Sequence, residues 1–200
     1  AIPGIDNSAT LIFVMNHRSN MDYVLVTHLA ADRSALSYAV GEWARVWPLS
    51  SVIRAMGAYF IRRKSRGALY RKVLARYVQM ATAGGVSQAV FPEGRLSVTG
   101  AVDVPKLGLL SYIVGGYKEG GRDVVFVPVA LNYDRVLEDR FLIKADKTGE
   151  RRFRPPLWTI MSGTMNHLWA RVTRRFKKFG TAAVSFGAPL KLSEQLAWPG

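Results

Sequence analysis

The stretch LIFVMNHRSNMDYVLVTHLAA, residues 11–31, indicates how this chain folds. Its first five residues are apolar and predict a buried strand, and residues 21–31 have the apolar spacing of a helix. Between the two lies a polar turn, in which Ser19 or Asn20 is placed to cap the helix. A strand, a polar turn and a helix in succession are typical of α/β proteins.

The same alternation continues along the rest of the chain. Short apolar runs predict further strands at 36–40, 58–61, 87–91, 123–133 and 182–192. Helical spacing of apolar residues predicts helices at 47–56, 66–85, 105–117 and 157–180, and polar composition predicts a loop at 138–156. We therefore expect a mixed α/β fold with a central β-sheet flanked by helices.

Two of these segments carry more specific expectations. In the helix 66–85, the apolar residues form one stripe and three cations lie off it; the stripe is Leu69, Val73, Tyr77 and Met80, and the cations are Arg71, Lys72 and Arg76. The pair Gly84–Gly85 should end this helix. Pro128 falls inside the run 123–133 and should sit at an edge or a bulge, because proline cannot donate to a strand ladder.

Composition limits the chemistry and the partners. The chain has 200 residues, enough for one domain over 1–200, and because it does not begin with Met we expect a piece of a longer protein. It has no cysteine and three histidines, so thiolate chemistry is excluded and no metal site is expected. The formal net charge of +14 favours an anionic partner. No uncharged apolar run reaches the roughly 18 residues of a membrane-spanning helix.

His17 and Asp22 are the candidate catalytic pair. Five residues of helix turn through about 500°, so the two side chains meet only if they do not both lie in one helix. The predicted turn and helix meet this condition, because Asp22 in the first helical turn could reach back to His17. The carboxylate would then hold one imidazole nitrogen and leave the other to accept a proton.

Three further motifs follow or interrupt predicted strands. GAYFIRR at 57–63 ends a strand with two arginines, FPEGRLS at 91–97 places an acid and a glycine after another, and VFVPVALNYDR spans 125–135. In this order, together with NHRSNMD at 16–22, the motifs resemble those of the glycerolipid acyltransferases, most closely the glycerol-3-phosphate branch. The resemblance covers roughly residues 10–140.

The resemblance implies an enzyme that moves a fatty acyl group from acyl-CoA or acyl carrier protein to the sn-1 hydroxyl of glycerol-3-phosphate. This reaction is the first step of phospholipid synthesis. Acyl-CoA or acyl carrier protein is the co-substrate, and no cofactor is expected. His17 would be the general base and Asp22 its orienting partner, with no covalent enzyme intermediate. Arg63 would bind the acceptor's phosphate, and Arg62 only if the strand ends early, because adjacent strand residues point to opposite faces.

The motif FPEGRLS at 91–97 supplies further expected substrate-binding residues. Glu93 would hydrogen-bond a glycerol hydroxyl, and Gly94 would let the substrate approach the backbone closely; the open alternative is that they form only a turn. Arg95 stands one residue earlier than the arginine of the family's usual pattern, and Lys106 is the alternative cation. Two strand residues are expected to line the acyl chain or to support the site, Phe60 and Pro128.

Other interpretations stay open at this point. The segment 157–180 joins aromatic residues to a basic end, which favours a peripheral helix on the cytoplasmic side of an anionic membrane; the alternative is a helix packed on the sheet.

The acceptor could also be lysophosphatidate or dihydroxyacetone phosphate. From a different class, the chain could be a basic nucleic-acid- or lipid-binding module without catalysis. Its aromatic residues are mostly placed as core, and RNA-recognition and zinc-finger signatures are missing, so nucleic acid is not the expected partner.

Overall fold

The computed structural model describes residues 6, 8–19, 21–30, 37–41, 51, 58–61, 67–136, 142–143, 147 and 180–197. Within these ranges, the structure describes the backbone but not the side chains at 23–24, 29–30, 38–41 and 58–61. The predicted helices at 47–56 and 157–180 lie outside the described residues, apart from residues 51 and 180. Most of the predicted loop at 138–156 lies outside them as well.

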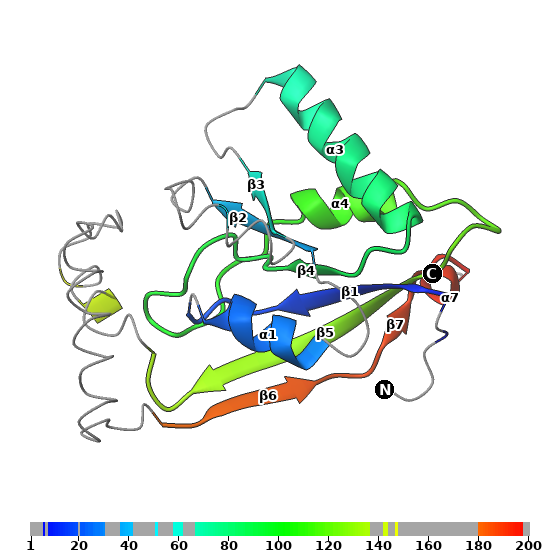
Figure 1. Cartoon of the computed structure of the whole chain (residues 1–200). Coiled ribbons are helices and arrows are strands. Elements are labelled where there is room, and N and C mark those ends of the chain that lie inside the picture. The colour runs from blue at the N-terminus through cyan, green and yellow to red at the C-terminus, as the bar shows by residue number, and fades with distance from the viewer. Residues whose placement is uncertain are drawn as a thin grey trace.

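One central sheet organises the described part of the chain (Figure 1). Its strands are β1 (Thr10–Met15), β2 (Ser37–Gly41), β3 (Ala58–Ile61), β4 (Gln88–Val90), β5 (Val124–Tyr133), β6 (Ala182–Phe186) and β7 (Leu190–Lys191). The order is β3-β2-β4-β1-β5-β6, and β7 also pairs with β5. Strands β1 to β5 run parallel, whereas β6 and β7 run antiparallel to β5. The predicted mixed sheet is confirmed.

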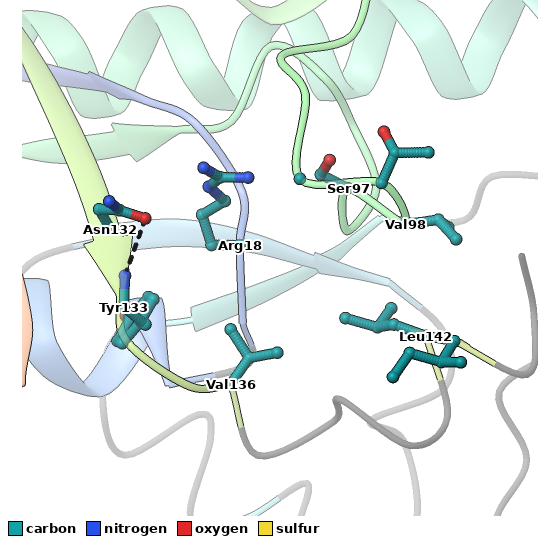
Figure 2. Close-up of a pocket in the computed structure, with 10 residues that line it drawn as sticks. Arg18, Ser97, Val98, Asn132, Tyr133, Val136 and Leu142 are labelled. Atoms are coloured by element: carbon teal, nitrogen blue, oxygen red, sulfur yellow. Dashed lines mark hydrogen bonds between the residues drawn. The ribbon is translucent and has the colours of Figure 1, made fainter. Parts of the chain in front are cut away.

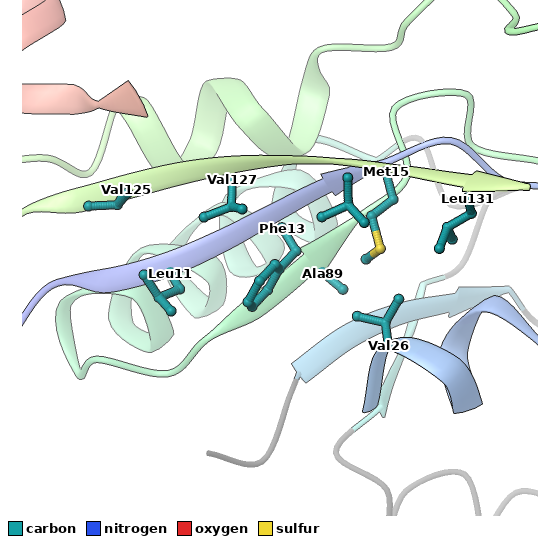
Figure 3. Packing of buried hydrophobic residues seen from close by; sticks show 9 residues of the cluster. Leu11, Phe13, Met15, Val26, Ala89, Val125, Val127 and Leu131 are labelled. Carbon is teal, nitrogen blue, oxygen red and sulfur yellow. The ribbon is translucent and has the colours of Figure 1, made fainter. Parts of the chain in front are cut away.

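Helices cover both faces of this sheet. The described helices are α1 (Asp22–Ala30), α3 (Ala68–Ala83), α4 (Gly108–Val114) and α7 (Leu192–Leu196). On one face, Val26 of α1 packs into a cluster with Phe13 of β1 and Val127 of β5 (Figure 3). On the other face, Ile12 packs with Val78 of α3 and Ile113 of α4. Alternate residues of β1 therefore point to two covered faces, which explains why the run 11–15 is apolar throughout.

The apolar stripe of α3 faces solvent, although such a stripe usually marks the core-facing side of a helix. The four stripe residues are about half exposed or more, at 76% for Leu69, 58% for Val73, 49% for Tyr77 and 59% for Met80. The buried residues of α3 are instead Val78 and Thr82. The Thr82 carbonyl accepts the Thr10 hydroxyl at 2.7 Å, and the Thr82 hydroxyl accepts the Gln88 amide at 2.8 Å. Buried polar groups require such partners, so these contacts turn this side of α3 toward the sheet.

The helix predicted at 105–117 is shorter in the structure, because α4 begins only at Gly108. The Lys106 N–H donates to the Pro92 carbonyl at 2.8 Å, so this residue belongs to a connection with the loop after β4. The helix also ends earlier than predicted, at Val114, with Gly115 as its C-cap.

The strand predicted at 182–192 is divided into β6 and β7, and α7 follows directly. Pro128 lies opposite this division. On its antiparallel side, β5 pairs with β7 at Val125–Phe126 and with β6 at Val129–Tyr133, so Pro128 falls between the two ladders. The Pro128 carbonyl accepts the Gly187 N–H at 2.8 Å. The proline is thus accommodated within β5 without ending the strand.

The topology brings the predicted motifs to one edge of the sheet. Strands β4, β1 and β5 are parallel neighbours, so their carboxyl ends lie side by side. The loops that leave these ends contain residues 16–21, 91–107 and 134–136. In open α/β sheets, ligands bind outside the carboxyl ends of the strands, and this edge is where a site is expected.

Candidate active site

His17 and Asp22 are in contact, as their spacing predicted. His17 Nδ1 lies 2.9 Å from Asp22 Oδ2, and the two residues are 6% and 0% exposed. The same carboxylate oxygen accepts the backbone N–H groups of Arg18 at 2.7 Å and Ser19 at 3.0 Å. An ionised carboxylate can only accept hydrogen bonds, so the contact assigns the hydrogen to Nδ1 and leaves Nε2 of the neutral ring as a proton acceptor.

The predicted helix cap differs in detail. Helix α1 begins at Asp22, so neither predicted residue directly precedes it. The Ser19 hydroxyl accepts the Met21 N–H at 3.1 Å, which orders the turn just before the helix. Asn20, the other predicted cap, lies outside the described residues.

Tyr133 completes the hydrogen-bonding of the Asp22 carboxylate. The Tyr133 hydroxyl donates to Asp22 Oδ1 at 2.6 Å, across 111 residues of sequence. A second contact fixes this arrangement, because the Asn16 amide both donates to the Leu131 carbonyl at 2.9 Å and accepts the Leu131 N–H at 2.7 Å. No sequence pattern predicted a role for Tyr133, because only the pairing of β5 beside β1 brings it to Asp22.

Glu93 holds the backbone around His17. It is 3% exposed, and its two carboxylate oxygens accept the N–H of His17 at 3.0 Å and the N–H of Asp103 at 3.3 Å. The His17 carbonyl accepts the Ser97 N–H at 2.9 Å, and the imidazole ring lies 4.4 Å from the Phe91 ring. The motif FPEGRLS therefore packs around His17, and Glu93 already has backbone partners on both oxygens.

The predicted cations differ in their availability. Arg95 Nε donates to Asp103 Oδ2 at 2.9 Å, and this guanidinium lowers the pKa of Asp103 below its usual value of 3.8. Lys106 Nζ donates to the Glu93 carbonyl at 3.3 Å and lies beside Gly94, whose φ of 67° belongs to the left-handed region that favours glycine. Both cations are thus engaged within the loop that follows β4.

Of the remaining predicted residues, the described part of the chain places the side chain of Pro128 alone. Arg62 and Arg63 lie outside the described residues, directly after β3. Phe60 lies in β3 and pairs with Val40, but only its backbone is described. Pro128 is exposed in the middle of β5.

A cavity of about 270 Å³ is lined by Arg18, the residue after His17, and by Tyr133, the residue whose hydroxyl donates to Asp22. Figure 2 shows Arg18 between the loop that contains Ser97 and Val98 and the end of β5 at Asn132 and Tyr133. The wall opposite Arg18 includes the apolar side chains of three residues, Val136, Leu142 and Ile143. Arg18 stands directly after His17 in the NHRSNMD motif, and no sequence pattern predicted a role for it.

No group of three or more His, Asp or Glu side chains among the described residues could hold a metal ion. No helix in the described part of the chain is long and apolar enough to cross a membrane.

Comparisons with known proteins add the following findings. A family model described as Acyltransferase matches residues 3–132. The chain is 31% identical over 191 residues to a glycerol-3-phosphate acyltransferase of Xanthomonas campestris pv. campestris, covering 94% of this chain and 21% of the relative. It is 32% identical over 190 residues to a glycerol-3-phosphate acyltransferase of Shewanella loihica, covering 93% and 22%. The chain thus spans about a fifth of the length of the curated relatives it matches.

A solved structure shares the fold. The crystal structure of the 1-acyl-sn-glycerophosphate (LPA) acyltransferase of Thermotoga maritima is similar with a TM-score of 0.52 and 18% sequence identity. The match covers 96% of this chain and 58% of the other. At this identity the likeness supports the architecture of the sheet and its helices.

Proposed function

The chain belongs to the acyltransferase family, and from this premise we propose that it acylates a glycerol phosphate, in the first place the sn-1 hydroxyl of glycerol-3-phosphate. The acyl donor is acyl-CoA or acyl carrier protein, used without a cofactor. One observation carries the proposal: a chain of hydrogen bonds runs from the buried residues His17 and Asp22 to Tyr133, which lines a cavity at the carboxyl edge of the sheet.

The proposed reaction is a direct transfer. Nε2 of His17 accepts the proton of the acceptor hydroxyl while its oxygen attacks the thioester carbonyl carbon. The carbon–sulfur bond then breaks, and the departing thiolate takes a proton from the imidazolium, so that His17 returns to its neutral form. Asp22 stays ionised throughout and stabilises the imidazolium through Nδ1. No acyl group is attached to the protein at any stage.

The other residues bind or position the acceptor. Arg63, with Arg62 as the alternative, and Lys106 remain our proposed phosphate ligands. Arg95 would have to leave Asp103 before it could join them. Glu93 acts mainly by fixing the His17 backbone, because both its oxygens are engaged there and at Asp103.

We also propose that the enzyme works at the surface of an anionic membrane, on its cytoplasmic side. The exposed stripe of α3 supports this proposal, because it joins four apolar side chains to the exposed cations Lys72 and Arg76, and α3 contains no acidic residue. Apolar side chains flanked by cations suit an interface with anionic lipid.

Vesicle sedimentation tests the membrane proposal. Phosphatidylcholine vesicles with phosphatidylglycerol should bind the protein more strongly than vesicles without it, and Leu69→Gln with Val73→Gln should weaken that binding. Leu196→Gln removes an apolar side chain of similar exposure from α7 and is the control. Equal binding of the α3 variant and the control would contradict a docking role for this stripe.

The activity is tested by incubating the protein with labelled glycerol-3-phosphate, lysophosphatidate or dihydroxyacetone phosphate, each with acyl-CoA and with acyl carrier protein. We expect the fastest acylation with glycerol-3-phosphate. Faster turnover of lysophosphatidate would overturn the acceptor assignment. No transfer to any of the three, together with salt-sensitive nucleic-acid binding tighter than phospholipid binding, would favour the non-catalytic alternative.

A further inference from the structure

The cavity between the loop 97–100 and the end of β5 contains a cation, Arg18, to which the proposed reaction assigns no role. Arg18 is half-buried, and its backbone N–H donates to Asp22. Its guanidinium, by contrast, has no hydrogen-bond or ion-pair partner among the residues that the structure describes. Arg95 and Lys106, the two predicted phosphate-binding cations within those residues, do have such partners.

The position of the Arg18 guanidinium depends on a glycine. A Cβ atom added at Gly100 would lie 2.6 Å from Arg18 Nη1, closer than real Cβ atoms come to other atoms. Gly100 also has a φ of 83°, a backbone conformation that side chains disfavour. The Ser97 hydroxyl donates to the Ala101 carbonyl at 2.6 Å across the same turn. The loop 97–101 is therefore shaped so that Arg18 lies against its backbone.

We propose that Arg18 binds the phosphate group of the acceptor inside this cavity. A half-buried arginine whose guanidinium has no partner among the described residues is suited to an anionic ligand, and its fork of N–H groups fits phosphate oxygens. The neighbouring walls complete a site for a small phosphate ester. Thr99 and Asn132 supply polar groups, and Val98 and Val136 supply apolar contacts for a carbon chain.

Size and position favour the acceptor over the acyl donor as the ligand; this step rests on the proposed function. A cavity of about 270 Å³ is below the range of about 300–1,000 Å³ that is usual for drug-sized ligands, so it suits a three-carbon ester better than a whole acyl-CoA. Arg18 is also the residue next to His17. The hydroxyl and phosphate of glycerol-3-phosphate are separated only by three carbons, so adjacent residues can serve both.

Two of the alternative cations follow a strand that lies farther from β1. Arg62 and Arg63 follow β3, which lies three strands from β1 in the sheet. At about 4.8 Å per strand, the end of β3 is roughly 14 Å from the end of β1. A phosphate held near Arg18 therefore lies close to the imidazole without requiring long side chains to cross the sheet edge.

Binding and kinetics of an Arg18→Gln variant of the full chain test this inference. We expect the dissociation constant for sn-glycerol-3-phosphate, measured by calorimetry, and the KM for this acceptor to rise about 10- to 100-fold, as for the loss of a charge-assisted hydrogen bond. The KM for the acyl donor should stay within twofold. Arg18→Lys keeps the charge but loses the fork, and should give an intermediate loss. Lys118→Gln removes one exposed charge after α4 and should match the wild type.

The outcomes separate this inference from the proposed activity. Acceptor binding by Arg18→Gln within twofold of the wild type would overturn the role of Arg18, even if acyl transfer is intact. A higher donor KM with an unchanged acceptor KM would assign the cavity to the donor and also overturn it. If the wild type binds sn-glycerol-3-phosphate through Arg18 but transfers no acyl group, the site stands and the proposed activity falls. If Arg18→Gln fails to fold, the comparison of Arg18→Lys with the wild type decides.

Discussion

Removing the hydroxyl of Tyr133 tests whether the Asp22 carboxylate must be held from both sides. Tyr133→Phe keeps the ring and deletes only the donor that lies 2.6 Å from Asp22 Oδ1. A hydrogen bond to a charged group contributes about 1.5–3 kcal/mol to stability. Asp22 Oδ2 keeps three partners, at His17, Arg18 and Ser19, so we expect a loss in the lower half of that range.

The free energy lost with this hydrogen bond should be measurable in thermal unfolding and in the rate of acyl transfer. A loss of about 1.5–2 kcal/mol should lower the melting temperature by roughly 3–8 °C in a domain of this size. If the same hydrogen bond orients Asp22 when the imidazolium forms, kcat should fall about 10- to 30-fold, which is the rate equivalent of that energy. The KM for the acceptor should remain nearly unchanged, because the hydroxyl that is removed bonds to Asp22, while the ring that lines the cavity is kept.

A double-mutant cycle distinguishes this role from a general effect on folding. Asp22→Asn alone should lower kcat by about 10⁴-fold, as for the corresponding change in a Ser–His–Asp triad. If Tyr133 works through Asp22, the loss in the double variant should be well below the sum of the single losses. Tyr112→Phe, on the α3–α4 side of the sheet, serves as the control. Additive losses, or a Tyr133→Phe variant with wild-type stability and kcat, would refute the reasoning.

Three further changes have defined outcomes. Glu93→Gln should destabilise the protein by about 1–3 kcal/mol in urea unfolding, because an amide cannot accept two buried N–H donors equally well; unchanged stability would contradict its positioning role. Gly100→Ala should lower the stability by about 1–2 kcal/mol, because the backbone at Gly100 is left-handed. It should also weaken acceptor binding by displacing Arg18. Unaltered acceptor binding would contradict the proposal that the acceptor binds in this cavity. Arg95→Gln should raise the pKa of Asp103 toward 3.8 in an NMR titration. The ion pair of Arg95 with Asp103 stabilises the folded protein above the ordinary pKa of Asp103, and this stabilisation is lost as the pH falls through the lowered pKa. An identical titration of Asp103 in the variant and the wild type would contradict the pairing.

Most of the fold could be predicted from the apolar patterns of short stretches of sequence. The strand, turn and helix at residues 10–30 were predictable because each element shows its own apolar period within a few residues. The contact of His17 with Asp22 was predictable for the same reason, since one short turn separates them. The face that α3 buries was not, because apolar residues lie on two sides of this helix. The choice between them is made by hydrogen bonds of Thr82 to Thr10 and Gln88, which come from other elements.

The parts of the site that sequence reasoning missed depend on contacts between distant segments. Tyr133 reaches Asp22 only through the pairing of β5 with β1. Arg95 was a natural candidate for phosphate, but Asp103 lies eight residues away and pairs with it. Arg18 carries no spacing signal of its own. Its role follows from what surrounds it: a glycine that gives it room and a cavity in which the described residues offer its guanidinium no partner.

The rate of acyl transfer from a thioester to labelled glycerol-3-phosphate, compared between the wild type and His17→Gln, bears most directly on the central claim. The two proteins should be matched for folding by circular dichroism and thermal unfolding. With His17 as the general base, kcat should fall by about 10²- to 10⁴-fold while the acceptor still binds. A folded His17→Gln protein that retains kcat within threefold of the wild type would contradict the account.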